Sequence, residues 1–339
     1  MAKTPKHILV VRLSAMGDVA MTIPVIRALV NQNPEINLTV LTRKSFSPFF
    51  KDIPNVAVHI ADVTDRHKGV LGLFRLAKEL KQLQIDAVAD LHNVLRSKIL
   101  KLLLSGINFV QIDKGRSEKK ALITGKIFKQ LKTTHQRYAD VFQKLGITVD
   151  LSNPLYPEPR TLTEKTRDIT GEKKLKWIGI APFAQHESKI YPIEQLKSVI
   201  QELVKRHRIF LFGGGNQEMR KLEELQKMED NVINVSGKIS LDEELDLISN
   251  LDLMVSMDSG NAHLAAMLGK KVVTLWGVTH PYAGFYPFGQ DMRYALFADR
   301  NNYPRIPTSV YGNKYPEGYR DAISSIPDES IVKKIESLL

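Results

Sequence analysis

Short apolar runs alternate with amphipathic stretches along most of the chain, and this alternation predicts an α/β protein. The runs 253–257 and 272–277 are typical of buried strands, and the stretch between them of a helix that Ser259 can cap and Gly269 can end. This unit brings the polar residues 258–263 to the carboxyl end of a strand, where ligands bind in open α/β sheets. An ordinary turn, in which Asp and Ser only cap the helix, explains the local pattern equally well.

The first half of the chain repeats the pattern of strand followed by helix. Apolar runs predict strands at 7–11, 37–42, 56–60, 87–91 and 109–112. Helices are expected from the first strand to about residue 30, after residue 95 and over 135–145. Helical spacing also relates a set of apolar residues that we expect to face the core, namely Leu71, Phe74, Ala77, Leu80 and Leu83.

A turn-forming loop follows the first strand and contains Gly17 and Asp18. Gly17 allows the backbone to approach a ligand closely. The carboxylate of Asp18 would lie at the mouth of the first strand. Its ordinary role is to cap the next helix, and its sharper role is that of a general base. The loop alone favours the capping role.

Between residues 148 and 174 the pattern lapses, and three prolines fall close together. We interpret this stretch as a linker between domains 1–165 and 166–339. A second βα series then begins, with strands predicted at 177–181, 208–212 and 232–235, and with a capping box at 240–243. Two domains facing across a cleft are the simplest architecture, with a closing helix that is free to pack back on the first domain.

The glycine run after the second of these strands, 213–215, is neither a Walker A loop nor a dinucleotide fingerprint, although it permits close approach to a ligand. The glycine fingerprint of dinucleotide-dependent dehydrogenases is also missing after the first strand of this chain, which argues against that class of enzyme. No aromatic and basic interleaving supports binding of nucleic acid.

Composition and charge narrow the class of partner. The 339 residues include no cysteine, which excludes disulfides and thiolate metal sites. No apolar stretch is long enough to span a bilayer, and no signal peptide precedes the first strand, so we expect a cytoplasmic protein. Residues 1–150 hold 24 Lys and Arg against 12 Asp and Glu, whereas the whole chain has a net charge of +11. The basic excess therefore lies in the first half, which indicates a polyanionic partner or merely a soluble basic surface.

Four motifs, in order, resemble those of the family 9 glycosyltransferases, the ADP-heptose:lipopolysaccharide heptosyltransferases, and the likeness covers nearly the whole chain. Residues 8–18 resemble the family's strand and loop signature, R-x-S-x-x-G-D. Residues 189–192 resemble its K-x-W-P element, and residues 255–263 its V-S-x-D-[ST]-G-x-x-H element. Residues 238–241 also match.

The resemblance implies an α/β protein of the GT-B fold, with two Rossmann-like parallel-sheet domains. It implies an inverting, metal-independent transfer that needs no cofactor, with the acceptor on the N-terminal domain and a nucleotide-sugar, ADP-heptose, on the C-terminal one. Asp18 would be the general base, and Lys189 would meet the charge of the departing diphosphate. The implied donor-binding residues are Gly215, Ile239, Asp258, Ser259, Gly260 and His263.

The same resemblance gives the basic half a specific partner, the anionic inner core of lipopolysaccharide, and peripheral contact with the inner membrane. The candidate acceptor contacts are Arg66, Lys68, Arg96, Lys98, Lys114 and Arg116, for each of which a solvated surface charge is the alternative. The chain departs from the family at Phe183-Ala184, at Asn216-Gln217 and in the cysteine-free segment 318–323. A different donor or acceptor, or a non-catalytic module that binds nucleotides or polyanions, are therefore the alternative functions.

Overall fold

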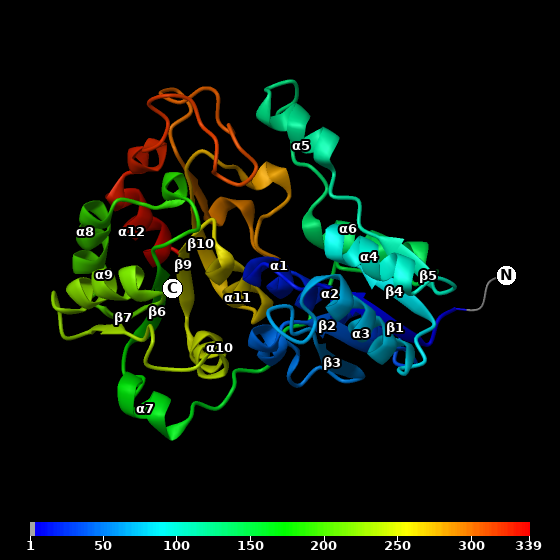
Figure 1. Cartoon of the computed structure of the whole chain (residues 1–339). Coiled ribbons are helices and arrows are strands. Elements are labelled where there is room, and N and C mark those ends of the chain that lie inside the picture. Colours follow the sequence, from blue (N-terminus) through cyan, green and yellow to red (C-terminus); the bar gives the residue numbers. More distant parts are fainter. Residues whose placement is uncertain (1–3) are drawn as a thin grey trace. The chain divides into compact units, whose positions relative to one another are not determined.

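The structure, a computed structural model, describes residues 4–339. The chain forms two compact units, each built on one parallel sheet (Figure 1). Unit 1 comprises the chain up to Lys114 together with Lys132–Leu155, and unit 2 comprises Gly115–Leu131 together with Tyr156–Leu339. Two parallel α/β sheets confirm the predicted fold class.

Unit 1 contains a five-stranded sheet in the order β3-β2-β1-β4-β5, in which every neighbouring pair is parallel. Its strands are β1 (His7–Val11), β2 (Asn37–Thr42), β3 (Val56–Ile60), β4 (Ala87–Asp90) and β5 (Asn108–Gln111). In the central strand β1 the four residues after His7 have no exposed surface. A strand covered on both faces needs apolar residues at successive positions, which is the pattern that the sequence shows.

The helices of unit 1 are α1 (Met16–Ala20), α2 (Thr22–Gln32), α3 (Gly69–Lys81), α4 (Leu95–Leu103), α6 (Thr134–Lys144) and the 3-10 helix η1 (Lys44–Phe50). The expected orientation of α3 is partly wrong. Ala77 and Leu80 are buried as predicted, but Leu71 is 81% exposed and Phe74 is 55% exposed. The buried face of the helix instead carries Leu73 with Leu76, because a broad apolar stripe leaves the side that meets the sheet undetermined.

Unit 2 contains a six-stranded parallel sheet in the order β11-β10-β9-β6-β7-β8. Its strands are β6 (Lys176–Ala181), β7 (His207–Leu211), β8 (Val232–Asn234), β9 (Leu253–Met257), β10 (Lys271–Trp276) and β11 (Ala295–Phe297). All strands predicted from the sequence are present in the two sheets, and their ends agree within one residue. The short edge strand β11 was not predicted.

The helices of unit 2 are α5 (Arg116–Ile123), α7 (Glu164–Thr170), α8 (Ile193–Leu203), α9 (Asn216–Gln226), α10 (Leu241–Asn250), α11 (Gly260–Met267) and α12 (Asp328–Glu336), with 3-10 helices η2 (Glu187–Lys189), η3 (Pro281–Ala283), η4 (Met292–Tyr294) and η5 (Ala322–Ser325). The predicted capping box is confirmed at α10, where the hydroxyl of Ser240 accepts from the Glu243 N–H and the carboxylate of Glu243 accepts from the Ser240 N–H. The closing helix α12 packs against α8 of the same unit.

Residues 115–131 belong to unit 2, although they fall inside the domain predicted as 1–165. Leu122 and Leu131 form an apolar cluster with Ala283, and the ring of Phe128 lies 5.0 Å from that of Tyr282. The ammonium of Lys119 stands 4.0 Å from the centre of the Phe285 ring. The units divide again at 155/156, before α7, rather than at residue 165, because the chain is already packed within unit 2 there.

Candidate functional site

The sheet of unit 1 reverses its strand order between β1 and β4. The chain proceeds from β1 to β2 and β3 on one side, and from β4 to β5 on the other. The carboxyl ends of β1 and β4 are therefore neighbours whose following loops diverge, which is where open α/β sheets bind ligands. Arg12 and Asp18 follow β1, and His92 follows β4.

Asp18 lies in the first turn of α1, and its carboxylate accepts a hydrogen bond from the Ala15 N–H at 3.2 Å. A guanidinium nitrogen of Arg12 lies 2.5 Å from the same carboxylate, and the other donates to the Leu91 carbonyl at 2.6 Å. Arg12 is buried, whereas the Asp18 side chain is 30% exposed. Arg12 thus ties the Asp18 loop to the strand beside it and leaves a carboxylate that a substrate can reach.

A buried carboxylate holds the neighbouring loop, which follows β4. Asp90 is fully buried, and its carboxylate accepts from the backbone N–H groups of His92 and Asn93 and from the amide of Gln111. Burial, with the charge of Arg12 second, lowers the pKa of His92 to about 4, so its ring is neutral at pH 7. A nitrogen of that ring lies 3.4 Å from the Ser14 hydroxyl.

Sequence reasoning did not select Arg12 or His92 as site residues. For Arg12 the available signal was the first position of the R-x-S-x-x-G-D signature, and for His92 it was the position directly after β4.

In unit 2 the order reverses between β6 and β9, and the two loops that follow them meet. The Lys189 ammonium, from the loop after β6, lies 3.1 Å from a carboxylate oxygen of Asp258, which follows β9. The same oxygen accepts from the Thr279 hydroxyl at 2.9 Å. Both charged side chains are only 12% exposed. The two predicted residues therefore form one partly buried ion pair at the switch point.

Ser259 occupies the N-cap position of α11. The predicted capping hydrogen bond to its hydroxyl is absent, however. The hydroxyl lies 3.0 Å from the Ser256 hydroxyl instead. The first N–H groups of α11, beginning at Gly260, thus receive no side-chain cap from Ser259, which leaves them available to an anion. His263 lies one turn further along α11 and is buried.

Gly215 and Ile239 lie after β7 and β8, at the same carboxyl edge of the sheet. Gly215 precedes α9 with a φ of 82°, a conformation that favours glycine. The carboxylate of Glu218 accepts from the Gly214 N–H at 2.8 Å, so an acidic residue meets the glycine loop despite the intervening Asn216-Gln217. Ile239 is half-buried.

The six basic residues predicted to contact an acceptor fall in both units. Arg66, Lys68, Arg96, Lys98 and Lys114 lie in unit 1, whereas Arg116 begins α5 in unit 2. Arg66 lies 2.5 Å from the Glu79 carboxylate and is thereby already paired. Arg96 lines a small apolar groove between the first turns of α3 and α4.

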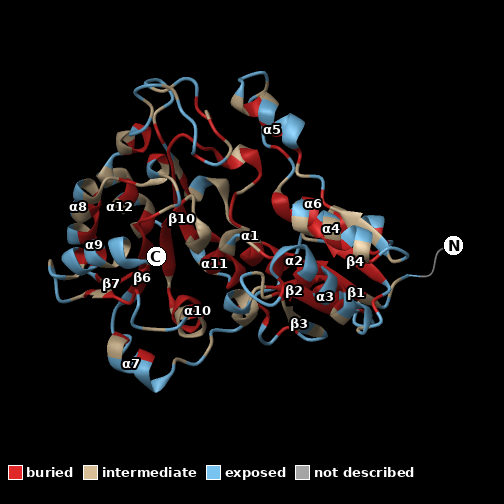
Figure 2. Cartoon of the chain, in the orientation of Figure 1, coloured by how far each residue is buried: buried red, intermediate tan, exposed pale blue. Residues whose placement is uncertain are grey.

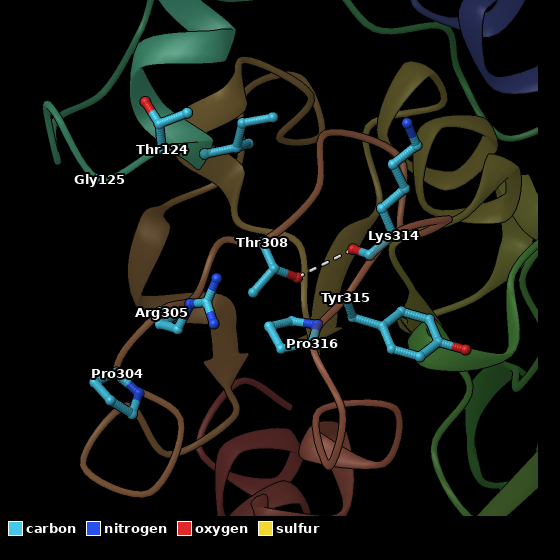
Figure 3. Close-up of a pocket in the computed structure, with 9 residues that line it drawn as sticks. Thr124, Gly125, Pro304, Arg305, Thr308, Lys314, Tyr315 and Pro316 are labelled. Carbon is cyan, nitrogen blue, oxygen red and sulfur yellow. Dashed lines mark hydrogen bonds between the residues drawn. The ribbon is translucent and has the colours of Figure 1, made fainter.

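Unit 2 contains a cavity of about 800 Å³, lined by Ile123, Thr124, Gly125, Pro304, Arg305, Thr308, Lys314, Tyr315 and Pro316. Figure 3 labels all of these residues except Ile123. No predicted site residue lines it. Thr308 donates to the Lys314 carbonyl at 3.2 Å and so joins two of its walls. In residues 4–339, no group of three or more His, Asp or Glu side chains is placed to hold a metal ion, and no helix is long and apolar enough to cross a membrane.

The loop that carries Lys189 is held by two glycines. A Cβ at Gly277 would lie 2.5 Å from the carbonyl oxygen of Ser188 and 3.0 Å from Ile323. The Ser188 hydroxyl donates to the Gly312 carbonyl at 2.5 Å, and a Cβ at Gly312 would meet the aliphatic stem of Lys189 at 2.8 Å. The position of Lys189 therefore depends on backbone that only glycine can bring so close.

Two parallel α/β sheets, each with polar residues at its switch point, match the architecture of GT-B heptosyltransferase structures. The fold is similar to that of a family 9 glycosyltransferase from Veillonella parvula, with a TM-score of 0.75, 21% identity and coverage of 98% of this chain and 97% of that one. It is also similar to the Escherichia coli heptosyltransferase WaaC with ADP, with a TM-score of 0.68, 19% identity and coverage of 98% and 100%.

Residues 73–307 match glycosyltransferase family 9 (heptosyltransferase), and the chain belongs to this family. Lipopolysaccharide heptosyltransferase 1 of Campylobacter coli is 26% identical to it over 98% of each chain. The chain is accordingly a glycosyltransferase of the lipopolysaccharide heptosyltransferase type, as the resemblance predicted.

The close approach at Gly277 predicts that Gly277→Ala will lower the free energy of unfolding by about 1–3 kcal/mol, because Ser188 must move away from the new methyl group. Thermal unfolding followed by circular dichroism measures the change. Gly214→Ala is the matched control, since a Cβ there meets no atom within 4 Å. Equal stability of the two variants would contradict the close packing inferred here.

Burial of neutral His92 predicts a loss of stability in mild acid. The unfolded chain binds a proton with a pKa near 6.5 and the folded chain with a pKa of about 4, so the unfolded state takes up more protons as the pH falls between these values. This one group should lower the free energy of unfolding by about 2 kcal/mol between pH 7 and pH 5. Chemical denaturation of wild type and His92→Gln should therefore give a shallower pH dependence for the variant, and parallel curves would refute the assignment.

Proposed function

We propose that this protein transfers heptose from ADP-heptose to the anionic inner core of lipopolysaccharide, with inversion at the anomeric carbon and without a metal ion. The observation that carries the proposal is the Lys189–Asp258 pair beside the uncapped start of α11. Family membership supports the reaction class, and the structure of the similar Escherichia coli heptosyltransferase WaaC with ADP supports the nucleotide.

On the donor side, the diphosphate would take the N–H groups at Gly260, the Ser259 hydroxyl and the ammonium of Lys189. These donors are in place before the reaction, so they can stabilise the charge that develops as the C–O bond to the phosphate breaks. Asp258 would repel a phosphate, and we assign it instead to hydroxyl groups of the sugar and to holding Lys189.

The nucleoside would lie along the neighbouring strand ends of the same sheet. Gly215 lets the backbone approach it, Ile239 offers a half-buried apolar surface to the adenine, and His263 donates to the diphosphate. Two departures of this chain from its family, Phe183-Ala184 after β6 and Asn216-Gln217 after β7, lie at the same edge of the sheet, which makes a different nucleotide-sugar the second candidate.

On the acceptor side, Asp18 would be the general base. Arg12 orients its carboxylate, and its partial exposure lets a hydroxyl group approach. The acceptor oxygen attacks the anomeric carbon, and its proton passes to Asp18. ADP leaves with the electron pair of the bond that joined the anomeric carbon to its phosphate oxygen. Each bond formed is matched by one broken, and no further reactant is needed.

The acceptor would be held by its negative charges. Lys68, Arg96 and Lys98 lie around the first turns of α3 and α4, and Lys114, Arg66 and Arg116 are the remaining candidates. Such an acceptor is carried by lipid, which favours a cytoplasmic protein that contacts the inner membrane peripherally. Nucleic acid is not an expected partner.

The donor assignment predicts selective binding of ADP over UDP and GDP in calorimetric titrations at one salt concentration. Lys189→Ala should weaken ADP binding by about tenfold or more, because a charged hydrogen bond is lost and Asp258 is left unpaired. Lys197→Ala, which removes a partly exposed lysine of α8 that pairs with Glu194, is the control and should bind like wild type. Preference for UDP or GDP would overturn the donor, and no binding of any nucleotide would favour a non-catalytic module.

The catalytic assignment predicts that Asp18→Asn will lower turnover by about 10²- to 10⁴-fold, the usual contribution of a general base. Affinity for ADP should stay unchanged, because Asp18 belongs to unit 1 and the donor residues to unit 2. Release of ADP from the donor with a lipopolysaccharide acceptor measures turnover. Asp52→Asn, at an exposed residue with a left-handed backbone that asparagine tolerates, is the control. Retained turnover in Asp18→Asn would exclude it as the base.

A further inference from the structure

Large apolar side chains are exposed together on α3 and α4 of unit 1. Of the twelve that are exposed in residues 4–339, five lie on these two helices, which comprise only 22 residues. Leu71, Leu95 and Leu102 are at least 75% exposed, and Val70 and Phe74 are more than half exposed. Single exposed apolar residues are ordinary on a protein surface, but a cluster marks an interaction site.

The two helices pack against each other, and the ribbons of both carry exposed positions (Figure 2). Val70 and Leu95 line the same groove of about 360 Å³ between the first turns of the helices. Phe74 lies one turn after Val70 on α3, and Leu102 lies two turns after Leu95 on α4, so each pair shares a face of its helix. We call these five residues the α3–α4 patch.

The charged residues around the α3–α4 patch are mainly basic, since helices α3 and α4 together contain six Lys and Arg and one acidic residue, Glu79. Segments 66–78 and 93–104 contain seven Lys and Arg and no Asp or Glu. Arg66 is paired with Glu79, and the other six are Lys68, Arg75, Lys78, Arg96, Lys98 and Lys101. Lysine and arginine stems extend over apolar surface while their charges reach outward, which suits a partner that is apolar inside and anionic at its face.

We propose that the α3–α4 patch docks the protein on the surface of a bilayer that contains anionic phospholipids. Leu71, Phe74 and Leu95 would enter the boundary between head groups and acyl chains. The surrounding cations would meet the negative surface potential of the lipid, as in interfacial helices.

Charge argues against a second copy of the chain as the occupant. A twofold contact would place the same basic rim against itself, with like charges opposed. A bilayer has no such penalty, and it also presents the apolar layer that three or more large side chains require. Only the reason for docking, which is to bring the site to a lipid-borne acceptor, rests on the proposed function.

The test is co-sedimentation of the full-length protein with vesicles of phosphatidylglycerol and phosphatidylethanolamine, and separately of phosphatidylcholine, without donor or acceptor. Wild type should bind the anionic vesicles, and binding should weaken with salt. Leu71→Ser/Phe74→Ser/Leu95→Ser should reduce the partition coefficient by about tenfold or more, because buried apolar area is lost. Lys78→Gln/Lys101→Gln should reduce it by about fivefold for each charge.

The matched control is Leu155→Ser/Leu175→Ser, which makes the same exchange at exposed leucines outside the patch and should bind vesicles like wild type. Circular dichroism should show unchanged folding of the triple variant, since all three side chains are exposed. The proposal would be overturned if wild type failed to bind anionic vesicles or if the triple variant bound them equally well. It would also be overturned if wild type were a dimer and the triple variant a monomer. Because no substrate is present, this result is independent of the test of ADP binding.

Discussion

Each sheet can place its functional loops side by side at only one position, the point where its strand order reverses. Elsewhere along a parallel sheet, the loops after neighbouring strands lead to the same face of the sheet and leave no crevice between them. In unit 1 this point lies between β1 and β4, and in unit 2 between β6 and β9. Asp18 and the Lys189–Asp258 pair occur at these two points. The strand order therefore determines where chemistry can occur in each unit.

At both points a charged side chain joins the two diverging loops, through a hydrogen bond in unit 1 and through an ion pair in unit 2. Arg12 connects the Asp18 loop to the strand end at Leu91, and Lys189 connects its own loop to Asp258. A partly buried pair adds little net stability, since desolvation offsets much of the attraction. Its effect here is geometric, because each pair fixes the orientation of a charge that a substrate must meet. The neutral ring of His92 behind Arg12 adds no competing charge to that loop.

The sequence predicts most of this architecture, because buried parallel strands are continuous apolar runs that few other structures share. It also predicts which residues follow the strands. It does not predict strand order, and so it missed Arg12 and His92, whose importance depends on β1 and β4 being neighbours. Nor does it predict that residues 115–131 pack in unit 2, since that follows from ring contacts of Phe128 across more than 150 residues. The capping role expected for Ser259 fails for a similar reason, because Ser256 offers its hydroxyl a partner.

The error at Leu71 and Phe74 has a different origin and a consequence for function. Helical periodicity identifies an apolar stripe, but burial in the protein and burial in a lipid surface select for the same residues. Helix α3 has apolar residues on two adjacent faces, and only the face with Leu73 and Leu76 is covered by the sheet. The second face would lower stability or solubility if nothing covered it. The basic residues around it indicate that the partner that covers it is negatively charged. An apolar face of a helix that is wider than the protein core can cover therefore indicates a second apolar environment.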